Sequence, residues 1–589
     1  MRRLGALPDS GRMSERKGAE PAAIILVPDP VQRVRLRLMN RNPFVHCARL
    51  ILCGAGIVSA ASHGDAAVQA PYTYVHHTVS TSVPAAQFAF DRGLTLVFAY
   101  DSDEAEQAFR EAARLDPSLA MAWWGIALAV GPNINNEPEP KSTLIAADSI
   151  ARAKLLASQH ATVQEREYID ALSVRYSSDP KPDFDKLAVA YRDAMRALVG
   201  RNPNDADATA LYAESIMDLH PWMLWSVDGK PAPDTLELVA LLENGLHRHP
   251  EHIGLMHYYI HAVEASNDPA RALAVARRLA ALPMEPAAAH LVHMPAHIYL
   301  RVGDWPSAIE ANEHAVHHAL DYRLSSNPKQ ERACGHCVDF LTYAYMMDGS
   351  ETKARTSAHD YQELSKDPTN AIAVLVRFHE WDDLLAFPEP ATELKPSAYH
   401  NSHARLGFWH FGRGLAFAAK GRAEPAESEL NALLAEAALV PPAPEFGEAL
   451  DVEHVLDKLA AADNADTVKI CTAVLRARIA ETHGQLAQAT EFLREAVRIQ
   501  DAMPYGEPPS WPYPIRESLG AMLLKQNSAA EAEATFRDGL IHSPHDPRLL
   551  LGVAEALQMQ GREVDAVNTR KEFQAAWTGN DAEIKVNEL

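Results

Sequence analysis

The sequence is poor in cysteine and in positive charge. It has 5 cysteines among 589 residues, and 55 Lys and Arg stand against 78 Asp and Glu, so the formal net charge at pH 7 is -23. So few cysteines exclude a disulfide framework as the main support of the fold. Nucleic acids and anionic membranes are bound through basic patches, so the negative charge argues against both as the main partner.

The sequence also lacks a Gly-rich phosphate loop, a G-x-S-x-G elbow and an H-E-x-x-H helix,. Its apolar run LILCGAGIVSAA, Leu50 to Ala61, is too short to span a membrane,. Basic residues and then this run are typical of a secretory signal peptide. We therefore expect residues 1–65 to be an N-terminal extension with a signal peptide, cleaved near residues 60–70. The mature chain is expected to be periplasmic or secreted, without a transmembrane segment.

Small and aromatic residues recur along the rest of the chain at a fixed spacing. In FDRGLTLVFAYDSDEAEQAFREAARLDP, which starts at Phe90, the positions of Gly93, Ala105, Phe109 and Ala112 match the tetratricopeptide consensus,. The same offsets return near residues 303, 421, 484 and 561. Small residues are needed where stacked helices approach closely. The chain thus resembles the tetratricopeptide-repeat (TPR) superfamily, and we predict an all-α, TPR helical solenoid.

The repeats are expected to fall into three regions. These are N-terminal TPR-like repeats in 66–200, central His-rich TPR-like repeats in 201–390 and C-terminal TPR repeats in 391–589. Pro-rich stretches near 131–140, 386–396, 440–446 and 504–514 are interpreted as loops between repeats. Solenoids bind ligands along a concave face lined by the first helix of each repeat. A small molecule or peptide in that groove is therefore the expected partner, with a protein partner also possible and no nucleic acid.

Histidine is dense in the central region, and its spacing is helical. In HYYIHAVE, His257, His261 and Glu264 are spaced i, i+4, i+7, which places them on one helical face,. HLVHMPAH follows, and then HCVDFLTY. Aligned to the repeat consensus, these segments put the same residue types at groove-facing positions of successive repeats. The predicted groove residues are His257, His261, Glu264, His290, His293, His297, His336, Asp339 and Tyr343.

This set predicts a metal site. Neighbouring helices pack about 8 to 10 Å apart, so side chains of adjacent repeats can converge. Neutral imidazole and carboxylate are ligands of zinc, copper, iron and manganese. The predicted ligands are His257, His261, His290, His293, His297 and His336. Asp339 and Glu264 are predicted as catalytic groups, as ligands or as residues that orient ligands, and Tyr343 as a hydrogen-bond donor.

Two functions from different classes follow from this groove. In the first, the protein is a metal-dependent enzyme acting on a small molecule or peptide. In the second, it is a non-catalytic interaction scaffold whose histidines contact a partner or form a pH-sensitive latch. A local objection concerns Pro295, which is expected to start or kink a helix, so that His293 could point differently from His297.

A redox interpretation competes at one position. Cys334-Gly335-His336-Cys337 matches the active-site tetrapeptide of protein disulfide isomerases. Such a pair acts as a redox centre near a strand-helix-strand pattern, and no such pattern surrounds it here. We therefore interpret the segment as H-x-x-D, made of His336 and Asp339.

Taken together, the three histidine motifs also match a pattern that is more specific than the general repeat. HYYIHA (257–262), HLVHMPAHI (290–298) and HCVDFLTYAY (336–345) resemble a group of bacterial TPR proteins that carry H-x-x-H-M-P-[SA]-H. The resemblance covers nearly all of the mature chain. It implies a shared polar site and points to no particular activity.

Overall fold

The computed structural model describes residues 74–283, 288–325, 331–391, 401–446, 450–579 and 584–586. Over these ranges the chain is helical, with only the isolated β-bridges Asn133–Asn136 and Trp225–Pro231. Residues Ala70–Leu589 form one compact unit. The predicted all-α fold is confirmed, whereas the signal peptide predicted in residues 1–65 lies outside the described residues. In those same ranges, no helix combines the length and apolarity needed to cross a membrane.

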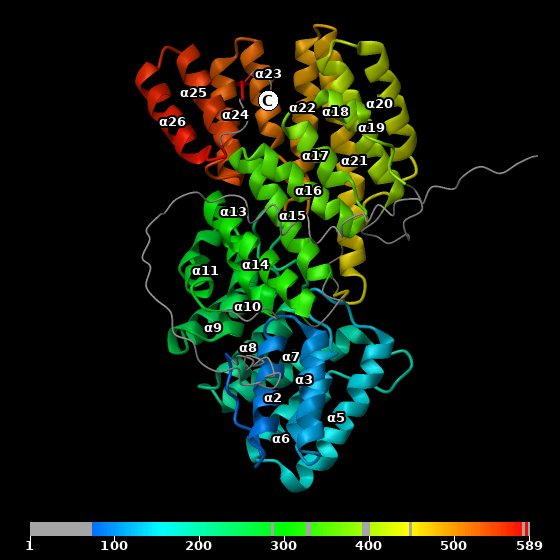
Figure 1. The fold of residues 1–589 in the computed structure, drawn as a ribbon, viewed down its shortest axis with the longest axis vertical. Helices are drawn as coiled ribbons and strands as arrows, with labels where there is room; N and C mark the ends of the chain where they lie inside the picture. The colour runs from blue at the N-terminus through cyan, green and yellow to red at the C-terminus, as the bar shows by residue number, and fades with distance from the viewer. Residues whose placement is uncertain are drawn as a thin grey trace, which may run out of the picture. The chain divides into compact units, whose positions relative to one another are not determined.

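The helices follow one another along the chain (Figure 1), and most of the connections between them are short, with longer ones before α9, α21 and α23. The first are α2 (Pro84–Val97), α3 (Ser102–Leu115), α4 (Ala120–Ala129), α5 (Pro140–His160), α6 (Val163–Ser173), α7 (Phe184–Arg201), α8 (Ala206–Met217) and α9 (Thr235–Arg248). The central ones are α10 (Ile253–Glu264), η1 (Pro269–Ala272), α11 (Leu273–Ala280), α12 (Ala289–His293), α13 (Pro295–Val302), α14 (Trp305–Ser325), α15 (Glu331–Asp348), α16 (Glu351–Ser365), α17 (Thr369–Arg377) and α18 (Trp381–Ala386). The last are α19 (Ser402–Ala419), α20 (Ala423–Ala437), α21 (Val455–Thr482), α22 (Leu486–Ala502), α23 (Ile515–Lys525), α24 (Ala529–His542), α25 (Pro547–Met559) and α26 (Glu563–Ala576).

An aromatic ring wedged between glycines marks the repeat. Phe109 of α3 packs so closely on Gly93 of α2 and Gly125 of α4 that an added Cβ would lie 2.7 and 2.3 Å from its ring. Only glycine leaves room for such a contact. The same wedge recurs near the C-terminus, where Phe536 of α24 packs between Gly520 of α23 and Gly552 of α25. The helical fold is therefore that of a TPR-like solenoid, with the same packing unit at both ends.

Contacts between distant parts of the chain hold the central repeats to the C-terminal ones. Trp305 Nε1 at the start of α14 donates to the His545 carbonyl at 3.4 Å. Buried Arg377 at the end of α17 pairs with Glu517 of α23 at 2.6 Å. In a simple solenoid each repeat touches only its neighbours. These contacts bring the segment between α22 and α23 close to the histidine-bearing helices.

Candidate metal centre

The predicted histidines are brought together inside the protein. His257 and His261 lie on α10, His290 and His293 on α12, His297 on α13 and His336 on α15. Of these, His257, His261, His293 and His297 expose at most 4% of their surface. These four positions are thus enclosed, whereas His290 is partly exposed and the His336 side chain is 35% exposed.

The first cluster, histidine cluster A, consists of His257, His261 and His290. One ring nitrogen from each lies within 4.8 Å of the other two. His290 Nε2 is 3.1 Å from His257 Nε2. The Tyr100 ring packs over the cluster, with its centroid 4.6 Å from that of His257. Cluster A is therefore a convergent set of imidazole nitrogens under an aromatic cover.

The second cluster, histidine cluster B, consists of His293, His297 and His336, whose ligand atoms also lie within 4.8 Å of one another. His293 Nε2 and His297 Nε2 are 2.8 Å apart. Phe340 of α15 covers this cluster, with ring centroids 4.5 to 4.9 Å from the three imidazoles. As expected, a new helix starts at Pro295: α12 ends at His293 and α13 begins at the proline. The break does not separate the rings of His293 and His297.

The other ring nitrogens are fixed by hydrogen bonds. His257 Nδ1 donates to the Phe98 carbonyl at 2.7 Å. His293 Nδ1 is 2.6 Å from Asn312 Oδ1, and the amide orientation follows because Asn312 Nδ2 donates to the Ala308 carbonyl at 2.8 Å. An imidazole that donates from Nδ1 has a lone pair on Nε2 when it is neutral. His257 and His293 therefore present Nε2 lone pairs toward their clusters.

Glu264 of α10 joins the two clusters. Its Oε1 is 2.6 Å from His261 Nδ1 and its Oε2 is 2.6 Å from His297 Nδ1. Tyr505 donates to the same Oε2 at 3.0 Å, and Glu507 Oε2 is also 2.6 Å from His297 Nδ1. His261 Nε2 is buried without a hydrogen-bond partner among the described residues. The carboxylates thus engage the Nδ1 side of both rings.

Burial controls the protonation of most of these rings. It holds the pKa of His257, His290 and His293 well below its usual range, and it lowers the pKa of His336 to about 3. Burial also opposes a charge on His297, but Glu507 and Glu264 outweigh it and raise the pKa of that ring to about 10. At neutral pH the others are neutral imidazoles, the form that binds metals.

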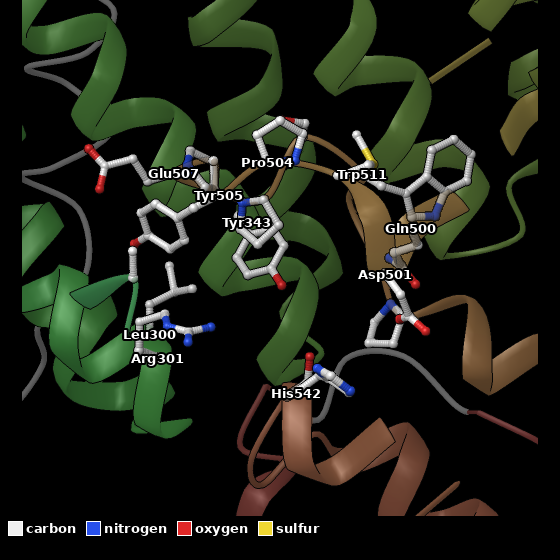
Figure 2. Close-up of a pocket in the computed structure, with 18 of the residues that line it drawn as sticks. Leu300, Arg301, Tyr343, Gln500, Asp501, Pro504, Tyr505, Glu507, Trp511 and His542 are labelled. Carbon is white, nitrogen blue, oxygen red and sulfur yellow. The ribbon is translucent and has the colours of Figure 1, made fainter. Parts of the chain in front are cut away.

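A loop from the C-terminal half covers the centre beside a cavity of about 300 Å³ (Figure 2). This loop, residues 503–514, is one of the predicted Pro-rich connections and lies between α22 and α23. Tyr505 and Glu507 of the loop line the cavity together with Arg301 and Tyr343, and the cavity reaches His297. The cavity is therefore a route between the exterior and cluster B.

The remaining predicted residues lie beside the centre. Tyr343 is buried on the cavity wall, where its ring lies 6.4 Å from that of Trp305 rather than against the histidines. Asp339 accepts a hydrogen bond from Asn370 at 2.7 Å and lines another cavity, and burial raises its pKa to about 7. The Cys334 side chain lies outside the described residues, and Cys337 is buried within α15. The structure thus unites the histidines with Glu264 and leaves Asp339 apart.

Sequence reasoning missed the covering residues. Glu507, Tyr100 and Asn312 contact histidines of the clusters. Tyr505 donates to Glu264, from which it is 241 residues away along the chain. The available signal was EPPSWPYP (507–514), an unusual run for a simple connection. The run predicts a loop between repeats and belongs to the resemblance to bacterial TPR proteins, but neither indicates contact with the histidines.

Comparisons with known proteins do not assign this chain to a family. No family model matches the chain. One curated relative, an uncharacterized protein of Aquifex aeolicus (strain VF5), is 44% identical over 55 residues, which is 9% of this chain and 7% of that protein's length.

Among solved structures, the human IFIT1 dimer with PPP-AAAA is 13% identical, covering 84% of this chain and 91% of its own, with a TM-score of 0.29. Naa15/Naa10 bound to HypK-THB is 14% identical, covering 84% and 76%, with a TM-score of 0.23. Scores this low carry no functional argument.

Proposed function

We propose that this protein binds two metal ions, one at histidine cluster A and one at histidine cluster B. One observation carries the proposal. The Nδ1 atoms of His257 and His293 are held by hydrogen bonds, so the Nε2 atom of each ring faces the Nε2 atom of another histidine in its cluster. Metal-binding histidines characteristically donate their other N–H to a carbonyl or carboxylate. Two nitrogens about 2.0 to 2.1 Å from one tetrahedral ion are roughly 3.3 Å apart, and the paired Nε2 atoms are 3.1 and 2.8 Å apart.

The donor set narrows the choice of metal. Imidazole nitrogens suit zinc, copper and iron, whereas manganese prefers oxygen ligands. Three histidines leave a coordination position open, as catalytic zinc sites do. We therefore propose zinc, copper or iron, held by three imidazoles in each cluster, with Glu264 orienting His261 and His297. His297 is cationic in the metal-free protein and gives up a proton when the ion binds,.

The proposed activity is metal-dependent chemistry on a small molecule that enters the cavity of Figure 2. Its volume is at the lower end of the range for small-molecule pockets. A metal so held supplies a Lewis acid and lowers the pKa of bound water. Glu264 and Tyr505 keep the Nδ1 sides of the rings in place, and the aromatic rings of Tyr100 and Phe340 exclude water. Buried histidines fit the scaffold alternative poorly, because a partner segment could not reach them.

Metal analysis of the purified mature chain, loaded with zinc or copper and desalted, tests the proposal. We expect two ions per chain, and one after either His257→Ala or His293→Ala. His314→Ala, at an exposed position of α14, is the matched control and should retain two. Because these histidines are buried, each variant is also unfolded thermally. Metal at a hundredfold excess over Kd should stabilise the folded protein by about 2.7 kcal/mol for each occupied site, so the wild type should gain about twice as much as either single-site variant. A folded wild type that retains no metal contradicts the proposal.

Export belongs to the same proposal and rests on the predicted signal peptide. N-terminal sequencing of the chain recovered from outside the cytoplasm should begin near residues 60–70. An intact N-terminus in the cytoplasm would exclude export.

A further inference from the structure

A second cavity, separate from the histidine clusters, lies among helices of the C-terminal half. Its volume is about 520 Å³. Its walls come from α17, α19, α21, α23 and α25 (Figure 1). These helices lie far apart in sequence, yet each contributes side chains to one space. We refer to it as the arginine cavity.

Positive charge gathers in this cavity, against the trend of the chain. Arg377, Arg478, Lys525 and Arg548 line it, and the acidic residues among its lining are Glu481 and Glu517. The formal net charge of the lining is therefore +4 - 2 = +2. The whole chain carries -23. An excess of positive charge in one cavity of an acidic protein indicates that the cavity binds an anion.

The acidic residues are already engaged. Glu481 accepts from Arg478 at 3.1 Å and also pairs with Lys525. Glu517 pairs with Arg377 at 2.6 Å. Both carboxylates therefore pair with other cations, although Glu517 Oε1 is buried without a hydrogen-bond partner among the described residues.

Arg548 has no such partner. It is 3% exposed, one Nη donates to the Arg377 carbonyl, and its Nε has no hydrogen-bond partner. Among the described residues, no carboxylate makes an ion pair with it. Burial, together with the charge of Arg377, lowers its pKa to about 9. The charges of Glu517 and Asp546 favour the guanidinium without forming an ion pair with it. Buried charges are normally paired, so the charge of Arg548 is only partly compensated and its Nε is left as an unused donor among the described residues.

We propose that the arginine cavity binds a phosphate monoester, with the phosphate beside Arg548 and Arg377. A phosphate monoester carries a charge of about -1.5 to -2 at pH 7, which matches the excess of the lining. Planar guanidinium groups bind phosphate oxygens bidentately. The space suits an organic group as well as the phosphate. Trp381 and His379, whose rings stack at 5.0 Å, form an aromatic wall for that group.

Calorimetric titration of the full mature chain with inorganic phosphate, phenyl phosphate, sulfate and succinate tests this assignment. EDTA-treated protein is used, so that phosphate cannot bind through metal ions. We expect phenyl phosphate to bind at least tenfold more tightly than inorganic phosphate or succinate. Succinate binding as tightly as phenyl phosphate, or no binding of phenyl phosphate at 10 mM, overturns the proposal.

Variants locate the binding. Arg548→Met should weaken phenyl phosphate binding at least tenfold, and Arg548→Lys, which keeps the charge but loses the planar fork, should weaken it less. Arg110→Met, on the exposed face of α3, is the control and should bind as the wild type does. Unchanged affinity in folded Arg548→Met contradicts the site. The His257→Ala variant should bind phenyl phosphate normally, which separates this site from the proposed metal centre.

Discussion

Replacing Asn312 by leucine tests the central argument about the metal centre. Asn312 is 0% exposed on α14, and its Oδ1 accepts the Nδ1–H of His293 at 2.6 Å. Leucine has nearly the same size and no acceptor. In Asn312→Leu, the proton of neutral His293 is free to move to Nε2, the atom that we assign to the metal.

The expected effect is a specific loss of affinity at cluster B. Removing the hydrogen-bond partner of a ligating histidine typically weakens metal binding 10- to 100-fold, which is about 1.4 to 2.7 kcal/mol. A buried N–H left without an acceptor also destabilises the protein by about 1 to 3 kcal/mol. Cluster A should keep its affinity, because His257 donates to the Phe98 carbonyl instead.

The assay is a competition titration of zinc against a chelator of known affinity, with thermal unfolding of the metal-free variant alongside. Asn244→Leu is the matched control, because Asn244 also donates to the carbonyl four residues earlier, at 2.8 Å, but lies on the surface. A folded Asn312→Leu protein whose two zinc affinities both lie within twofold of the wild type would refute the reasoning.

Two further predictions concern stability. Gly303 has φ +72°, and an added Cβ would lie 1.9 Å from the Pro544 carbonyl oxygen, so Gly303→Ala should lower the free energy of unfolding in urea by more than 2 kcal/mol. At Gly421, with φ +69° and open space, alanine should lower it by only about 1 kcal/mol,; equal losses would contradict the clash. Asp207 is hydrogen-bonded to His77, and although burial lowers the pKa of His77, this bond and the Asp207 charge raise it overall. That stabilisation is complete below about pH 6.5 and disappears as pH rises through the folded pKa. The Tm difference between wild type and Asp207→Asn should therefore be larger at pH 5.5 than at pH 8.5, since Asp207 itself is ionised at both.

The helical period explains which parts of the centre could be predicted. His257, His261 and Glu264 share a face because residues three, four and seven apart do so on any helix. The repeat register then brought the faces of α10, α13 and α15 together. Asp339 follows His336 by three residues, the spacing that also separates His261 and Glu264, yet its carboxylate accepts from Asn370 rather than meeting the histidines. Spacing thus places a residue on a face, but the neighbouring helix decides its partner.

Other parts depended on the path of the chain in space. Nothing in the local pattern near Glu507 indicates that its loop reaches His297. The arginine cavity was missed for the same reason, because its cations come singly from separate helices. Both features belong to the C-terminal half, and Glu507 of that half contacts His297 of cluster B.

The covering loop also sets an order of events in synthesis. The histidines leave the ribosome long before the loop does, because Tyr505 is 241 residues from Glu264. Until those later residues are made and folded, the clusters have no lid. In the finished protein, Tyr505 and Glu507 of the loop line the cavity that reaches His297, so the last residues to be made form the passage to the earlier ones.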